Sequence, residues 1–149
     1  MSDDGSPIAG IGHVAIKVAD VERTLRFYRE AFGFGELMRL NRDDGTLWLV
    51  YLRITDTQFL EVFPGARGTQ APDEDANGLN HLCLEVGDMD AALARLDAAG
   101  IEPFRPRRRG LDGNEQAWVR DPDGNRIELM RMSPDGMQRR AILERRLPG

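Results

Sequence analysis

The sequence has a single cysteine, a single lysine and two histidines among its 149 residues. With Cys83 alone, no disulfide can form within the chain, which favours a reducing compartment, and we expect a cytoplasmic protein. No apolar run approaches the roughly 18–20 residues of a membrane-spanning helix, so we expect no membrane partner. A net charge of −5 argues against general affinity for nucleic acid, whose phosphates attract basic proteins.

What the sequence does contain is an internal repeat. The stretch GHVAIKVADVERTLRFYREAFGF aligns with NHLCLEVGDMDAALARLDAAGI, so that His13 falls on His81, 68 positions later. Further along, QFLEVF aligns with RIELM, which places Glu61 over Glu128 at an offset of 67. A nearly constant offset in two separated blocks predicts two similar modules.

The repeat also defines the expected domain organisation. Residues 10–132 form one domain, with a first module at 10–63, a linker at 64–78 and a second module at 79–132. The linker is rich in glycine, proline, alanine and acidic residues, as connecting segments often are. Residues 1–9 are expected to be a disordered lead-in. Residues 133–149 are expected to be a helical tail that begins near Pro134.

Each module has the pattern of a β-α-β-β-β unit. An alternating, β-prone strand is followed by an aspartate at the N-cap position, a helix and a terminating glycine: Asp20 and Gly33, then Asp88 and Gly100. The expected strands are 11–18, 35–40, 46–53 and 58–63, then 79–86, 102–105, 115–120 and 125–131, with helices over 21–32 and 89–99. The predicted class is α+β.

Strand alternation brings four chemically important side chains to one kind of surface. Successive side chains of a strand point to opposite faces, so His13, Glu61, His81 and Glu128 all lie opposite the apolar residues expected under the helices. Two imidazoles and two carboxylates suit a borderline divalent cation, and the two carboxylate charges offset those of the ion. Four such ligands leave positions open on an octahedral ion, unlike closed, cysteine-rich structural zinc sites. The sequence therefore predicts a catalytic metal site.

Three further side chains are candidate substrate contacts. Lys17 shares a face with His13, and Cys83 shares a face with His81. Arg105 begins the basic run Arg-Pro-Arg-Arg-Arg, which would clamp a phosphate or carboxylate. Two of them have a structural alternative: a cysteine is more often a small core residue, and an arginine run between two strands is more often a solvated hairpin loop, the interpretation we favour here.

Four stretches, GHVAIKVADVERTLRFYREAFGF, TQFLEVF, LNHLCLEVGDMDAALARL and VRDPDGNRIELM, resemble the vicinal oxygen chelate superfamily, the group of glyoxalase I, bleomycin-resistance proteins and extradiol dioxygenases. The resemblance covers most of the chain from Gly10 to Met132. It implies two modules that form a U-shaped, cup-like mixed sheet with helices on the outer face. The cup would surround one divalent ion, nickel, cobalt, zinc, manganese or iron. The four ligand positions of glyoxalase I fall on His13, Glu61, His81 and Glu128.

The implied activity is that of a metal-dependent, glyoxalase I-like lyase or isomerase, as in lactoylglutathione lyase. A proton leaves a carbon beside a carbonyl through a metal-stabilised enediolate or enolate, with Glu128 as the base by family analogy and Glu61 as the alternative. The arginine that glyoxalase I usually carries four residues after its first histidine is Lys17 here, which keeps the charge without the fork geometry. The substrate class is a small molecule, anionic or a thiol conjugate.

Three alternatives share the scaffold. A methylmalonyl-CoA epimerase-like isomerase would use the same enolate chemistry. An extradiol-type dioxygenase would bind iron(II) through His13, His81 and Glu128. A metal-free, bleomycin-resistance-type module would only bind a small molecule. Related domains often complete their sheets or sites across a two-fold axis, so we expect a homodimer whose ligands come from one chain or from two.

Overall fold

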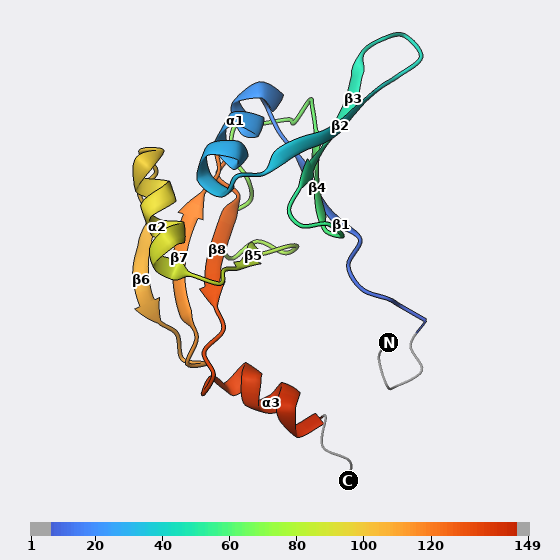
Figure 1. Cartoon of the computed structure of the whole chain (residues 1–149). Coiled ribbons are helices and arrows are strands. Elements are labelled where there is room, and N and C mark those ends of the chain that lie inside the picture. The colour runs from blue at the N-terminus through green and yellow to red at the C-terminus, as the bar shows by residue number, and fades with distance from the viewer. Residues whose placement is uncertain (1–6, 146–149) are drawn as a thin grey trace. The chain divides into compact units, whose positions relative to one another are not determined.

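The computed structural model describes residues 7–145 of the chain. They fall into two compact units, one with the residues up to Thr69 except Glu30–Phe32, the other with Glu30–Phe32 and the residues from Gln70 onward (Figure 1). The first module contains β1 (His13–Lys17), α1 (Val21–Phe32), β2 (Gly35–Asn41), β3 (Leu47–Arg53) and β4 (Phe59–Phe63). The second contains β5 (Leu82–Glu85), α2 (Met89–Ala98), β6 (Arg105–Arg109), β7 (Glu115–Arg120) and β8 (Arg126–Arg131), followed by α3 (Met137–Arg145). The predicted α+β class and the two β-α-β-β-β modules are confirmed.

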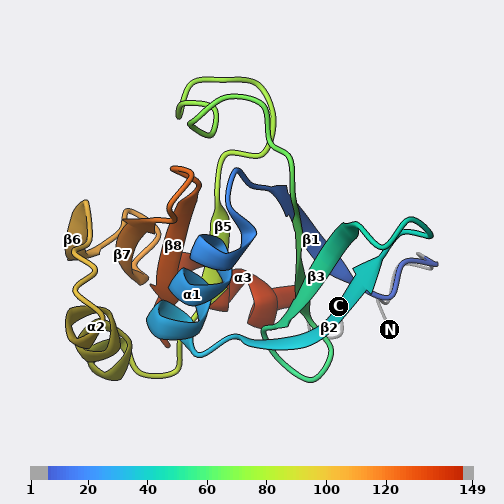
Figure 2. The same ribbon diagram turned by 90° about the horizontal axis from the view of Figure 1, so that it is seen from above.

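Each module builds one four-stranded sheet, and the two sheets have the same topology. The strand order is β1-β4-β3-β2 in the first and β5-β8-β7-β6 in the second, and Figure 2 shows β8 and β7 between β5 and β6. The first strand of each module runs parallel to the last, whereas the other pairs are antiparallel. The register is also shared, because Ala15 lies opposite Glu61 and Cys83 lies opposite Glu128. The repeat is therefore confirmed in the strand pairing itself.

The two module helices begin where their aspartates predict. The Asp20 carboxylate accepts a hydrogen bond from the Arg23 amide at 3.0 Å, and the Asp88 carboxylate accepts one from the Ala91 amide at 3.1 Å. Each bond satisfies one of the amide groups that the first turn of a helix leaves without an intrahelical partner. Gly33 ends α1 in the left-handed conformation, with φ 77°, which glycine adopts without steric cost.

The β2–β3 and β6–β7 connections use the same turn. In each, a glycine with positive φ follows an aspartate whose side chain accepts the amide hydrogen bond of the residue two further on: Asp44-Gly45-Thr46 and Asp112-Gly113-Asn114. The second turn is the more enclosed, since Asn114 is fully buried and its side chain also bonds Gln138 and the Ser133 amide. The Asp112 carbonyl accepts the Met137 amide at 2.7 Å, so this turn holds the start of α3.

Alternation along the inner strands separates the two faces of each sheet as expected. Leu60 and Val62 in β4, and Ile127 and Leu129 in β8, are buried apolar residues. The residue between each pair, Glu61 or Glu128, points to the other face because side chains alternate along a strand. In the second unit α2 contacts β8. The glutamates are thus carried by the best-supported strands of their sheets, each with a neighbour on both sides.

The prediction for the arginine run was wrong. It placed a strand at 102–105 and a loop after it, whereas Arg105–Arg109 is itself β6. β6 lies at the end of its sheet's strand order, where proline and charged side chains are tolerated because one edge has no ladder to complete. A register shift between Arg105 and Arg108 accommodates Pro106. The arginines are further held by acidic partners, as described below.

Smaller differences occur at the ends of elements. β5 begins at Leu82 rather than at residue 79, so His81 lies just before the strand. The Asn80 carbonyl accepts a hydrogen bond from the Arg126 side chain, which ties this backbone to the preceding loop. α3 begins at Met137, three residues after Pro134. Of the expected lead-in, residues 1–6 lie outside the described residues. None of the helices within residues 7–145 combines the length and apolar character that a membrane crossing requires.

Candidate functional site

The first histidine–glutamate pair lies on two neighbouring parallel strands. His13 opens β1 and Glu61 occupies the middle of β4, where Ala15 is its direct partner. The His13 Nε2 and Glu61 Oε2 atoms are 3.3 Å apart. The glutamate side chain is 8% exposed, whereas the imidazole is 48% exposed. The sheet therefore holds a polar pair at its surface, in which the carboxylate is nearly buried and the imidazole is accessible.

The second pair has the equivalent position in the second unit. His81 immediately precedes β5, and Glu128 occupies the middle of β8. The His81 Nε2 and Glu128 Oε2 atoms are 3.2 Å apart, with the side chains 30% and 13% exposed. The structure thus brings together the predicted site residues as two pairs, His13 with Glu61 and His81 with Glu128.

The spacing within each pair suits two ligands of one metal ion. Divalent ions hold imidazole nitrogen and carboxylate oxygen at about 2.0–2.2 Å. Elementary geometry then separates neighbouring donors by about 3.0 Å on an octahedron and about 3.4 Å on a tetrahedron. The two measured distances fall in this interval. Within residues 7–145, no group of three or more His, Cys, Asp or Glu side chains is arranged to hold a metal. Each unit therefore offers two donors.

An aromatic residue from the next strand flanks each pair. Tyr51 lies directly opposite Glu61 in β3, and Trp118 lies opposite Glu128 in β7. A hydrogen bond from the Tyr51 hydroxyl to the Glu61 carboxylate raises the pKa of Tyr51, because losing the proton would place two negative charges together. Sequence reasoning missed Tyr51 as a site residue. The signal was available, since Tyr51 and Trp118 have the same offset of 67 as the glutamates.

Trp118 contacts His81 more closely than Tyr51 contacts His13. The ring centroids of His81 and Trp118 are 4.6 Å apart in an edge-on arrangement, whereas those of His13 and Tyr51 are 6.3 Å apart. The Trp118 indole donates its hydrogen bond to Gln116. It therefore acts on His81 by packing.

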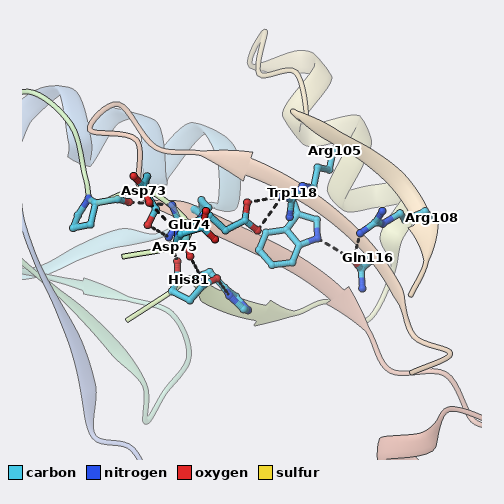
Figure 3. Close-up of polar contacts among 11 residues, drawn as sticks. Asp73, Glu74, Asp75, His81, Arg105, Arg108, Gln116 and Trp118 are labelled. Atoms are coloured by element: carbon cyan, nitrogen blue, oxygen red, sulfur yellow. Dashed lines mark hydrogen bonds and ion pairs between the residues drawn. The ribbon is translucent and has the colours of Figure 1, made fainter. Parts of the chain in front are cut away.

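Asn80 adds a polar contact to His81 that the sequence analysis also missed. The His81 Nδ1 and Asn80 Oδ1 atoms are 2.9 Å apart, and the Asn80 Nδ2 group donates to the Glu74 carbonyl at 2.8 Å. Figure 3 shows Glu74 and its neighbours Asp73 and Asp75 close to His81 and Trp118. The segment predicted to be a linker thus contributes side-chain and main-chain groups around His81.

The segment predicted to be a linker, 64–78, also supplies the carboxylate that neutralises Arg105. Its Nη2 atom contacts both Glu74 carboxylate oxygens, at 2.9 and 2.7 Å, and its guanidinium lies 5.4 Å from the centre of the Trp118 ring (Figure 3). Arg107 is bound to Asp90 and Glu115, and Arg109 to Asp135. Because these arginines already have carboxylate partners, the run is a set of ion pairs along β6.

Lys17 and Cys83 lie where strand alternation predicts. Lys17 is exposed at the end of β1, four residues after His13 and on the same face of the strand. Cys83 is directly opposite Glu128 in the β5–β8 ladder. The residue as a whole is exposed, but partial burial of the thiol and the neighbouring Glu128 carboxylate raise the pKa of Cys83 to about 12. A thiol that stays protonated is a poor nucleophile, so Cys83 is a neutral neighbour of the glutamate.

Known proteins are similar to this chain over most of its length. A family model described as the Glyoxalase/Bleomycin resistance protein/Dioxygenase superfamily matches residues 10–129. The lactoylglutathione lyase of Pseudomonas aeruginosa is 26% identical over an alignment of 148 positions, which covers 83% of this chain and 83% of that protein. The crystal structure of a glyoxalase family protein from Enterococcus faecalis has a TM-score of 0.70 and 31% identity, over 82% of this chain and 97% of that one. The lactoylglutathione lyase from Agrobacterium tumefaciens has a TM-score of 0.64 and 25% identity, over 85% and 96%.

The agreement is of three kinds: a duplicated fold, a histidine and a glutamate at matching positions of each module, and family similarity across residues 10–129. The resemblance recognised in the sequence motifs is confirmed. The chain belongs to the Glyoxalase/Bleomycin resistance protein/Dioxygenase superfamily.

Proposed function

We propose that this chain is a metal-dependent lyase or isomerase of the glyoxalase I type, which moves a proton at a carbon beside a carbonyl. The observation that carries the proposal is the repeated histidine–glutamate pair, with donor atoms 3.3 and 3.2 Å apart on equivalent strands. Relatives named lactoylglutathione lyase support the same reaction class.

The proposed ligands are His13, Glu61, His81 and Glu128, two from each unit. The donor set fits nickel, cobalt, zinc, manganese or iron, because neutral imidazoles and carboxylates are ligands that these ions share. When bound, the ion supplies Lewis-acid stabilisation of the negative charge that develops on neighbouring substrate oxygens as the proton leaves.

Glu128 is the better candidate for the base, and Glu61 for the fixed ligand. Glu61 is the more enclosed of the two carboxylates, and Tyr51 lies directly opposite it in β3. Glu128 has a larger exposed fraction than Glu61, 13% against 8%, and its ladder neighbours are Cys83 and Trp118. A carboxylate must reach the proton that it removes, so accessibility favours Glu128.

The substrate class is a small carbonyl compound with an anionic part, such as a thiol conjugate. Lys17 lies on the same face of β1 as His13 and is exposed, so it is the proposed contact for the anionic group. Arg105, the other basic candidate, is held by Glu74 in a two-oxygen contact. It serves a substrate only if that ion pair opens, which leaves Lys17 as the first choice.

Elemental analysis of protein purified without chelator tests the site. We expect near-stoichiometric metal in the wild type, a large loss in His81→Ala and Glu61→Ala, and no loss in Glu102→Gln, which removes an exposed carboxylate of the second module. Solvent-deuterium incorporation into methylglyoxal hemithioacetals and acyl-CoA thioesters then tests the chemistry. Equal metal content in all four proteins would place any metal elsewhere. Metal without exchange on any carbonyl substrate would refute the reaction.

The second candidate is an extradiol-type dioxygenase. It is supported by the surroundings of Glu61, because a nearly buried carboxylate that turns to the Tyr51 hydroxyl opposite it would leave His13, His81 and Glu128 as a 2-His-1-carboxylate set for iron(II). Oxygen uptake with ring cleavage of catechols, and no deuterium exchange, would select this activity.

We further propose that the chain forms a homodimer. Mixing two inactive double variants determines whether one metal site takes its ligands from both chains of the dimer. His13→Ala/Glu61→Ala removes the first pair and His81→Ala/Glu128→Ala removes the second, so each protein alone should be inactive. If sites are shared between chains, a mixed dimer has one intact site, and random mixing restores about a quarter of all sites. If each chain forms its own site, mixing restores nothing. A monomer mass at micromolar concentration would contradict the dimer.

A further inference from the structure

The two histidines differ in how the backbone of their sheet holds them. His13 is the first residue of β1 and is paired in register with Phe59 of β4. The same step in the second module would pair His81 with Arg126, but β5 begins one residue later, at Leu82. His81 therefore lies outside the strand pairing that fixes His13, and its position depends on other contacts.

The side chain of Arg126 supplies such a contact. Its Nη2 group donates a hydrogen bond at 2.6 Å to the Asn80 carbonyl, which belongs to the peptide group directly before His81. The same guanidinium donates to the Pro72 and Asp73 carbonyls, at 3.0 and 3.3 Å, because its planar fork of N–H groups can reach several acceptors at once. Arg126 is only 7% exposed, so little water competes for these bonds. One side chain thus ties both ends of the segment 72–80 to β8.

The strand that carries Arg126 also carries Glu128. The two residues are two positions apart in β8 and therefore lie on the same face of the sheet. β8 itself is paired on both sides, with β5 and with β7. It fixes Glu128 through its own backbone and the backbone before His81 through Arg126. The distance of 3.2 Å between His81 Nε2 and Glu128 Oε2 is therefore set from one strand.

The fold itself does not need an arginine at this position. The equivalent residue of the first module, 67 positions earlier, is Phe59, and the two sheets have the same strand order. Burying a guanidinium is costly, and within residues 7–145 the Arg126 Nε group is buried without a hydrogen-bond partner. An apolar residue would avoid this cost. The arginine is therefore explained by the backbone that it holds, and not by the packing of β8.

We infer that Arg126 is a positioning residue, which replaces the missing strand pairing at His81 and holds this histidine beside Glu128. The placement of His81 is a property of the protein without metal. The consequence for metal affinity rests on the proposed function, which the inference deepens.

The first test follows the contact between the His81 and Trp118 rings, whose centroids are 4.6 Å apart. Nuclear Overhauser cross-peaks between their ring protons report this contact in chelator-treated protein. We expect a several-fold loss of intensity in Arg126→Met, which keeps an unbranched apolar side chain and removes the guanidinium. Arg131→Met, the same change at an exposed arginine of the same strand, should leave the cross-peaks unchanged. Full intensity in Arg126→Met would overturn the inference.

Folding of the variant is checked by amide exchange. The amides of the β7–β8 pairing should exchange as slowly in Arg126→Met as in the wild type, because Phe59 shows that the sheet accepts an apolar residue at this place. If Arg126→Met does not fold, Arg126→Lys takes its place. Lysine keeps the positive charge but replaces the fork with one compact ammonium group, so the ring contact should again weaken. Full intensity in a folded Arg126→Lys protein would then overturn the inference.

Zinc titration in two backgrounds separates positioning from a general structural role. Loss of a residue that orients a ligand typically lowers metal affinity by about 10–100-fold. We expect a loss of this size when Arg126→Met is added to the wild type or to His13→Ala, and little change when it is added to His81→Ala, which lacks the ligand that Arg126 positions. An equal loss in both alanine backgrounds would show that Arg126 acts on the fold as a whole, and would overturn the inference.

The two readouts also distinguish this inference from the proposed function. If the wild type binds no zinc while the ring contact depends on Arg126, the proposed metal function fails and the positioning of His81 stands. If zinc binds while the ring contact is insensitive to Arg126, the positioning role fails and the metal function stands.

Discussion

The two modules have the same strand order, first-to-last strand register, helix N-caps and hairpin turn, yet they surround their histidine–glutamate pairs differently. In the first module the carboxylate is the more enclosed and has Tyr51 opposite it, while Gly12 offers His13 no side-chain contact. In the second module the imidazole is anchored, because Asn80 and the Trp118 ring contact His81.

This difference shows which features of the repeat are interchangeable. Backbone pairing and the two donor types recur at offsets of 67 and 68, whereas the residues that orient those donors do not. The two pairs are therefore expected to be unequal: one provides a more enclosed carboxylate and a more exposed imidazole, the other a contacted imidazole and a more accessible carboxylate. The first three predictions below compare a residue with its counterpart in the other module, and the last compares one ion pair from each unit.

The largest effect is expected when the glutamates are exchanged for glutamine. At saturating metal, Glu128→Gln should lower the deuterium exchange rate by about 10³-fold, in the range typical of a lost general base. Glu61→Gln should act mainly through metal affinity and recover much of its rate as metal is added. Rates measured across a metal titration check this, and the opposite ranking would assign the base to Glu61.

Tyr51→Phe should remove the hydroxyl opposite the first carboxylate. We expect metal affinity to fall by about 10-fold, the lower end for a residue that orients a ligand, because the Glu61 carboxylate then loses a polar neighbour but keeps its place in β4. Trp118→Phe, the change at the equivalent position, keeps an apolar ring beside His81 and should have the smaller effect. Calorimetric zinc titrations of both variants make the comparison.

The two hairpin turns should differ in their contribution to stability. Asn114→Ala should lower the free energy of unfolding by about 2 kcal/mol, because it removes a fully buried side chain and leaves the partly buried Ser133 amide without its partner. Thr46→Ala, at the same place in the exposed turn, should cost about 0.5 kcal/mol or less. Denaturant unfolding of both proteins measures the difference, and equal losses would mean that the contacts to α3 contribute nothing.

The smallest effect is expected when an ion-paired glutamate is replaced and the unfolding midpoint is followed as the pH falls. The hydrogen bond to Arg105 holds the pKa of Glu74 below its ordinary value of 4.5, and the bond to Arg39 does the same for Glu36. Because the unfolded chain takes up these protons first, each pair stabilises the fold above pH 4.5 and loses this effect as pH falls below it. Glu74→Gln and Glu36→Gln should each flatten the decline of unfolding midpoint between about pH 6 and pH 3. A decline as steep as in the wild type would show that the pair is broken in solution.

The sequence predicted those features that follow from local chemistry. Asp20 and Asp88 marked the helix starts, and the repeat placed Glu61 and Glu128 on equivalent strands, because capping and alternation depend on residues close in the chain. The arginine run was placed wrongly because its charge suggested a solvated loop, while its actual partners, Glu74, Asp90 and Asp135, come from distant segments. Asn80 was overlooked because its role depends on Arg126 and on a segment taken for a plain linker.

The position of β8 has a consequence for how the protein is made. β8 is the last strand of the chain, yet it lies between β5 and β7. A growing chain therefore makes β5 well before β8, the only strand that pairs with it, and β5 keeps unpaired amide and carbonyl groups until Arg126–Arg131 emerges. Unpaired strand edges are where chains aggregate, so each module is vulnerable until its last strand, β4 or β8, is available. A truncation before Arg126 would make that vulnerable state permanent.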